Sequence, residues 1–79
     1  MERIIEVKPL ADYTIWVSFS DHLSGTLNMK PFITKGISRN LLDESFFRNV
    51  KIDEFGGICW ENGFDFCPNY LHELIEKTN

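Results

Sequence analysis

The chain has 79 residues, a hydrophobic content of 43% and a formal net charge of −4. This length gives a single domain with one core, and the hydrophobic content excludes an intrinsically disordered chain. The acidic balance argues against direct nucleic-acid binding, because phosphate contacts require a basic face.

The first residues and the cysteines predict where the protein works. The stretch from Met1 to Ile5 carries Glu2 and Arg3, unlike a signal peptide, and no apolar run reaches the roughly 18–20 residues of a membrane helix. We therefore expect no membrane partner. With two cysteines and no secretion signal, reduced thiols and a cytoplasmic location are expected.

The first part of the chain predicts three strands. Residues 4–8 form a short strand candidate, and residues 13–20 alternate apolar and polar side chains, which is typical of a half-buried strand. The returning strand, residues 23–29, follows a turn at Asp21-His22. A tight turn favours glycine at such a position, and here it is missing.

Two short helical segments are predicted next. Asn28 can cap residues 29–33, and Asp43 can cap residues 44–48. Residues 37–42 between them are expected to be connecting chain. The side chains expected to turn toward the core in this region are Ile37, Leu41, Leu42 and either Phe46 or Phe47.

The last part predicts a second hairpin and a helix. Residues 50–53 and 58–60 are expected to pair around the turn at residues 55–57, and the final helix begins near Pro68, a favoured first position. Its apolar stripe consists of Leu71, Leu74 and Ile75. The predicted order is β-β-β-α-β-β-α. This is an α+β fold, in which a small antiparallel sheet of two hairpins has its helices packed on one face.

The run from Trp60 to Tyr70 is dense in residues with specific backbone roles. It holds a strand end, a turn, an acid, a helix start and a docking residue, at Trp60, Asn62, Gly63, Asp65, Pro68 and Leu71. We expect the Asp65 carboxylate to accept backbone N–H groups at the start of the helix, where the helix dipole also favours an anion.

Three segments together resemble a known family. Residues 13–21 read Tyr-x-Ile-x-Val-x-Phe-Ser-Asp, residues 41–47 read Leu-x-Asp-x-x-x-Phe, and residues 60–71 read Trp-x-Asn-Gly-x-Asp-Phe-x-Pro-x-x-Leu. The chain therefore resembles a small bacterial domain of domain-of-unknown-function family 2442 (DUF2442), as one domain over residues 1–79. Two positions depart from that family. His22 replaces its usual glycine, and Asn28 stands where aspartate is frequent.

This resemblance implies a compact bacterial α+β domain with no established activity. Some members of the family look fused to a helix-turn-helix region. Others look encoded beside another small protein, in the manner of a toxin–antitoxin pair. Since these residues leave no room for a DNA-binding extension, we expect any regulatory role to act through a protein partner.

Acids and a thiol near the last helix give an alternative, a small hydrolase or thiol enzyme. Asp65 lies between two phenylalanines, which can raise the pKa of its carboxyl, and Glu61 is the nearby second acid. Cys67 at the expected helix start can become a thiolate. However, His72 falls more than one turn later, and the Cys67–His72 spacing fits no zinc pattern. We therefore expect no metal or cofactor, and the weight of the sequence is against an enzyme.

Trp16 is the candidate binding residue. It stands on the polar face of its strand between Thr14 and Ser18, so either another segment covers it or it is an exposed anchor of the kind found at binding hot spots. The preferred hypothesis is a non-enzymatic, cytoplasmic protein-interaction domain. It would bind a small protein partner, or itself as a homo-oligomer, through this face or an open strand edge.

Overall fold

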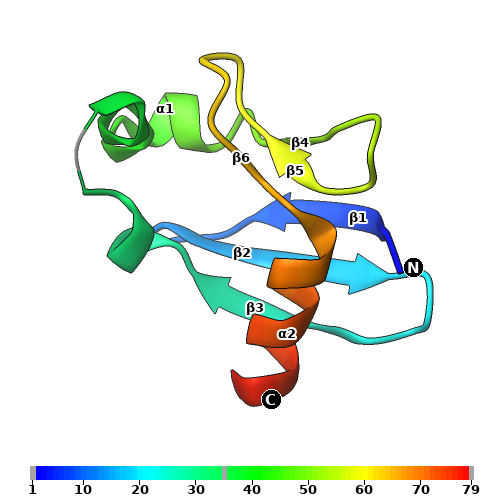
Figure 1. Cartoon of the computed structure of the whole chain (residues 1–79). Coiled ribbons are helices and arrows are strands. Elements are labelled where there is room, and N and C mark those ends of the chain that lie inside the picture. The colour runs from blue at the N-terminus through cyan, green and yellow to red at the C-terminus, as the bar shows by residue number, and fades with distance from the viewer. Residues whose placement is uncertain (1, 35, 79) are drawn as a thin grey trace.

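The computed structural model describes residues 2–34 and 36–78, and of Ile37 and Thr78 only the backbone. Two three-stranded antiparallel sheets and a C-terminal helix form the domain (Figure 1). The first sheet has the order β1-β2-β3, with β1 (Ile4–Pro9), β2 (Thr14–Phe19) and β3 (Ser24–Asn28). The second has the order β4-β5-β6, with β4 (Lys51–Ile52), β5 (Ile58–Cys59) and β6 (Asp65–Phe66).

Short helices connect the two sheets. Two 3-10 helices, η1 (Lys30–Phe32) and η2 (Gly36–Leu42), precede the α-helix α1 (Glu44–Phe47). The chain then forms the second sheet and ends in α2 (Pro68–Thr78), which crosses the first sheet in Figure 1. No described helix is long and apolar enough to span a membrane.

The core lies between the first sheet and α2. In β2 the residues Ile15, Val17 and Phe19 are fully buried and alternate with half-buried residues, as the period of two predicts. From α2, Leu71 and Ile75 are fully buried. Burying an aliphatic or aromatic side chain of this size stabilises the fold by about 1.5–3 kcal/mol, so this layer fixes α2 against the sheet.

Aspartate and asparagine side chains fix the turns. In each case the side-chain oxygen accepts the N–H of the residue two positions later, which holds the turn without a regular ladder. The pairs are Asp21 with Leu23 (3.0 Å), Asn28 with Lys30 (3.0 Å), Asp43 with Ser45 (3.0 Å), Asp53 with Phe55 (2.8 Å) and Asn62 with Phe64 (3.1 Å). The predicted cap at Asp43 is thereby confirmed, because Asp43 is the N-cap of α1. The predicted cap at Asn28 is wrong: the N-cap of η1 is Met29, which makes no side-chain cap bond, and Asn28 holds the turn that precedes this helix. At the first hairpin turn His22 adopts a φ of 75°, the conformation that the missing glycine would favour.

The α+β class is confirmed, and three further details of the prediction are wrong. The two hairpins lie in separate sheets rather than in one. Asp65 and Phe66 form a third strand of the second sheet, β6, which we did not predict. Residues 36–42 form a 3-10 helix instead of connecting chain, with Leu41 buried but Leu42 exposed. The side chain of Ile37 lies outside the described residues.

Candidate functional site

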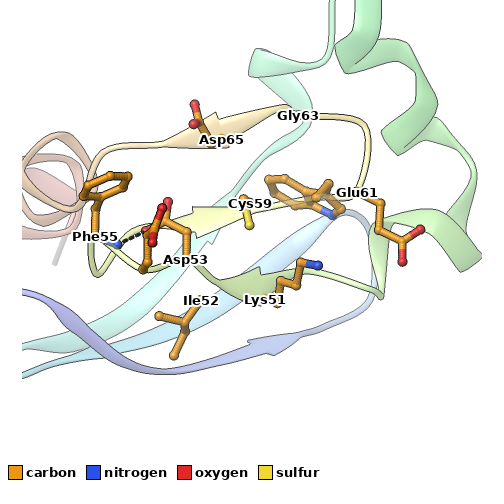
Figure 2. Close-up of a pocket in the computed structure, with 10 residues that line it drawn as sticks. Lys51, Ile52, Asp53, Phe55, Cys59, Glu61, Gly63 and Asp65 are labelled. Carbon is orange, nitrogen blue, oxygen red and sulfur yellow. Dashed lines mark hydrogen bonds between the residues drawn. The ribbon is translucent and has the colours of Figure 1, made fainter.

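A shallow hollow of about 570 Å³ opens on the second sheet, on the face that carries Cys59 (Figure 2). All of its lining comes from β4, β5, the start of β6 and the two turns that join these strands. The lining residues are Lys51, Ile52, Asp53, Glu54, Phe55, Cys59, Trp60, Glu61, Gly63 and Asp65.

Cys59 occupies the central strand of this hollow. Its cross-strand partners are Lys51 in β4 and Asp65 in β6, so the three side chains form one row on the same face. Burial raises the pKa of the Cys59 thiol, and the charges of Asp53 and Asp65 raise it further, while Lys51 acts in the opposite direction. The thiol is therefore protonated at neutral pH and is a weak nucleophile.

The charge of the hollow is mainly negative. Four carboxylates, those of Asp53, Glu54, Glu61 and Asp65, line it together with the single ammonium group of Lys51. In Figure 2 the side chains of Asp53 and Asp65 lie on either side of Cys59, whereas the carboxylate of Glu61 points away from it. A concave surface with an excess of one sign of charge raises the local concentration of groups of the opposite sign, so this hollow attracts cations.

Phe55 is exposed at the rim. It is 76% exposed, more than any other large apolar side chain in the described part of the chain. Its position is fixed, because the Asp53 carboxylate accepts the N–H groups of Phe55 (2.8 Å) and Gly57 (3.0 Å) (Figure 2). An aromatic side chain on a rigid turn loses little entropy on binding, which suits it as an anchor.

Asp65 does not have the capping role that we predicted. Its side chain is exposed, and in the described part of the chain no hydrogen bond joins its carboxylate to the start of α2. A regular backbone bond from the Leu71 N–H to the Cys67 carbonyl oxygen (3.2 Å) begins the helix. Because Asp65 pairs with Cys59 in the ladder, its side chain points to the hollow, away from the side of Phe64 and Phe66. The expected capping acid is thus a strand residue beside a surface hollow.

The three residues of the alternative enzyme hypothesis are only partly brought together. Glu61 lines the hollow of about 570 Å³, whereas Cys67 lines a second hollow of about 220 Å³; Asp65 lines both. The imidazole of His72 is engaged elsewhere, by Asp21 and Glu76. The described residues contain no group of three His, Cys, Asp or Glu side chains placed to hold a metal ion.

Trp60 is a core residue. It is 2% exposed, and its indole N–H donates to the carbonyl oxygen of Phe47 (3.0 Å). It belongs to a series of aromatic contacts beneath the second sheet, with neighbouring ring centroids 5.2 to 5.9 Å apart, formed by Tyr13, Phe47, Trp60, Phe64 and Phe66. These rings give the short strands β5 and β6 their apolar support.

The comparison with protein families decides which family this architecture represents. The family model described as "Protein of unknown function (DUF2442)" matches residues 4–77. The chain belongs to DUF2442. The resemblance drawn from its three segments is thereby confirmed. Neither the curated proteins nor the solved structures contain a match to this chain.

In this DUF2442 domain Trp16 is half-buried. It is therefore neither covered by another segment nor a fully exposed anchor, the two alternatives that the sequence left open. It lies on the outer face of the first sheet, the face opposite the buried Ile15, Val17 and Phe19. Its cross-strand partners are Lys8 in β1 and Thr26 in β3, and the Lys8 ammonium lies 5.3 Å from the centroid of the indole ring. A cation over the ring covers part of Trp16.

The sequence reasoning missed an ionic group at the other end of the first sheet. His72 contacts two carboxylates, Asp21 through Nε2 (2.8 Å) and Glu76 through Nδ1 (3.2 Å), and its ring packs edge-on against Phe19. The hydrogen bond to Asp21 raises the pKa of His72, with a contribution from Glu76, and lowers the pKa of Asp21. The four-residue spacing of His72 and Glu76 is visible in the sequence, but only the fold brings Asp21 to them.

Proposed function

We propose that this DUF2442 domain is a non-enzymatic protein-interaction domain that binds a partner segment with basic and apolar side chains. The observation that supports this proposal most strongly is the exposure of Phe55. Its side chain is 76% exposed at the rim of a hollow that four carboxylates line. A catalytic mechanism gives no role to an exposed aromatic side chain such as Phe55, whereas a docking surface uses it as an anchor for the partner.

The chemistry of the hollow selects the partner. An arginine or lysine side chain can stack its cationic group on the ring of Phe55 while it pairs with Asp65 or Asp53. Arginine fits better, because its planar guanidinium can stack and can bind a carboxylate with two N–H groups. The exposed ring of Phe55 also gives the hollow an apolar surface, against which an aliphatic neighbour of that arginine can pack.

The state of the thiols supports a binding role over catalysis. The pKa of Cys59 is raised by burial, which disfavours the thiolate that a nucleophilic mechanism requires. Cys67 and Glu61 line different hollows, and the two carboxylates bound to His72 occupy its ring nitrogens. A general base next to a nucleophile, which an acyl-transfer or hydrolytic enzyme needs, has no counterpart around the described hollows.

The family resemblance supplies the setting of the proposal. We place the domain in the bacterial cytoplasm, as the regulatory or antitoxin-like member of a two-gene pair. Its partner is then the small protein encoded beside it, and the basic segment of that partner occupies the Phe55 hollow.

A random peptide library displayed on phage tests the proposal without knowledge of the partner. We expect peptides selected on the wild-type protein to be enriched in arginine and aliphatic residues. Their affinity should fall about tenfold or more for Phe55→Ser, the loss typical of a hot-spot residue. Leu10→Ser is the matched control, because Leu10 is also exposed (38%) but does not line the hollow.

Two results would overturn the proposal. One is a selected set that binds Phe55→Ser as well as wild type. The other is a set dominated by acidic peptides, which the charge of the hollow disfavours. Far-UV circular dichroism and the Tm of each variant confirm that Phe55→Ser and Leu10→Ser remain folded.

A further inference from the structure

The strand β3 is a sheet edge with free backbone groups. At its two ends, Phe19 donates to the Leu23 carbonyl oxygen (2.7 Å) and Met29 donates to the Tyr13 carbonyl oxygen (2.8 Å). In an antiparallel pair the residues alternate in direction, so odd-numbered residues of β3 direct their N–H and C=O groups to β2. The remaining residues, Ser24, Thr26 and Asn28, direct theirs away from β2. Beyond the β2–β3 ladder, no hydrogen bond of the described residues uses these groups.

The edge at β3 also lacks the features that normally prevent pairing. Charged side chains, proline and bulges protect sheet edges in proteins. The opposite edge, β1, has them: a bulge between Ile4 and Glu6, a charged Lys8 and a terminal Pro9. In contrast β3 is uncharged, regular and free of proline over Ser24–Asn28. The strands of the second sheet have only two residues each.

We propose that a second copy of this chain pairs antiparallel with β3, which joins the two first sheets into one continuous sheet about a two-fold axis. Thr26 then lies opposite the partner's Thr26, and Ser24 lies opposite the partner's Asn28. This register uses the whole length of β3 and brings every outward-directed backbone group of one strand to one of the other. Cross-strand threonine pairs are favourable neighbours in antiparallel sheets.

The charges that flank β3 favour this occupant and this direction. Asp21 precedes one end of the strand, and Lys30 follows the other; both residues are exposed, and the Asp21 carboxylate also binds His72 and the N–H of Leu23. An antiparallel two-fold arrangement brings the Lys30 end of each copy to the Asp21 end of its partner, so opposite charges meet twice. A parallel arrangement would align like with like, which is unfavourable.

The same register brings the two copies of Trp16 onto one face of the joined sheet. Because Trp16 pairs with Thr26, one row crosses the joined sheet from Trp16 through both threonines to the partner's Trp16. At the usual strand spacing the two tryptophans stand about 14 Å apart on one continuous face. This surface exists only in the dimer and does not involve Phe55, so the proposal stands or falls independently of the proposed function.

Sedimentation velocity over a range of protein concentrations tests the dimer. We expect the wild type to shift from monomer to dimer as its concentration rises, since a single short strand pair gives a modest interface. Thr26→Lys should remain monomeric, because it puts two like charges opposite each other at the axis. Asn40→Lys makes the same charge change on the exposed side of η2 and should dimerise like the wild type.

A cysteine cross-link tests the register itself. In a Cys59→Ser, Cys67→Ser background, Thr26→Cys should form an intermolecular disulfide when oxidised glutathione is added, because directly opposed residues of an antiparallel pair have suitable Cα spacing. Asn40→Cys is the control and should not cross-link. A wild type that is monomeric at all concentrations, or a dimer that survives Thr26→Lys without the Thr26→Cys cross-link, overturns the proposal.

Discussion

The two sheets of the domain are held by different means. The first has strands of five or six residues whose alternate side chains fill the core. The second has strands of two residues, so its ladder is short, and its shape depends on turns fixed by Asp53, Asn62 and glycines. The first sheet therefore provides stability through burial. The second is a set of rigid turns over an aromatic layer, which presents Phe55 and its acids.

The largest expected effect is the loss of the aromatic support under the second sheet. Trp60→Ala removes a buried indole and its hydrogen bond to Phe47, which should cost about 3–5 kcal/mol. For a small domain this is a large share of the total stability. Trp16→Ala, on the outer face of the first sheet, should cost about 1 kcal/mol or less. Urea denaturation of both variants measures the difference; equal losses would contradict the difference in burial between Trp60 and Trp16.

A single methyl group should also disturb the second sheet. A side chain at Gly57 would collide with the backbone oxygen of Phe66 and press on the ring of Pro68, both at the β6–α2 junction. Because backbone cannot yield as a flexible side chain does, Gly57→Ala should cost about 1–3 kcal/mol. Thermal unfolding that leaves the Tm of Gly57→Ala unchanged would show that the junction is not closely packed.

The two aspartates of the hollow should differ in their effect on stability. Asp53→Ala leaves the N–H groups of Phe55 and Gly57 without their acceptor and should cost about 1–3 kcal/mol. Asp65→Ala removes an exposed carboxylate and should change stability by about 0.5 kcal/mol or less. Chemical denaturation of both variants checks this order. A loss for Asp65→Ala as large as that for Asp53→Ala would restore the capping role that the sequence suggested.

The smallest effect concerns the ionic group around His72. Its folded pKa is raised, so the charged imidazole stabilises the fold below its ordinary pKa of about 6.5, and this contribution is lost as the pH rises through the raised value. Asp21, whose pKa is lowered, stays ionised throughout that range. His72→Gln should therefore lower the Tm more near about pH 5.5 than near about pH 8.5.

A second histidine variant controls for this pH effect. His22 makes no ion pair in the described part of the chain, so His22→Asn controls for the replacement of a histidine as such. Asparagine also tolerates the left-handed backbone at this position. A His72→Gln curve parallel to the wild type across this pH range would exclude the ionic contribution.

The first sheet could be predicted from the sequence better than the second. The period-two alternation of β2, the cap at Asp43 and the helix start at Pro68 are local signals, and each was predicted. β6 was missed because two residues cannot display an alternation, and its pairing with β5 depends on the turn at Asn62-Gly63. With β6 missing, Asp65 looked like a capping acid instead of a strand residue.

The candidate site could not be predicted from local sequence patterns for a related reason. The exposure of Phe55 depends on where the turn at residues 55–57 lies relative to both sheets, and a turn pattern does not contain that information. Likewise the contact of Asp21 with His72 joins residues 51 positions apart. The individual residue types were visible in the sequence, but their assembly required the fold.

Backbone amide NMR spectra test the central claim most directly, which is that the second sheet carries the docking surface and the first provides the frame. The protein is titrated with the tightest peptide selected from the phage library. The account predicts that the perturbed amides concentrate in Lys51–Cys59, at Glu61 and at Asp65, with the inner strand β2 unaffected. Perturbations confined to the outer face of the first sheet around Trp16, with the Phe55 turn unchanged, would contradict it.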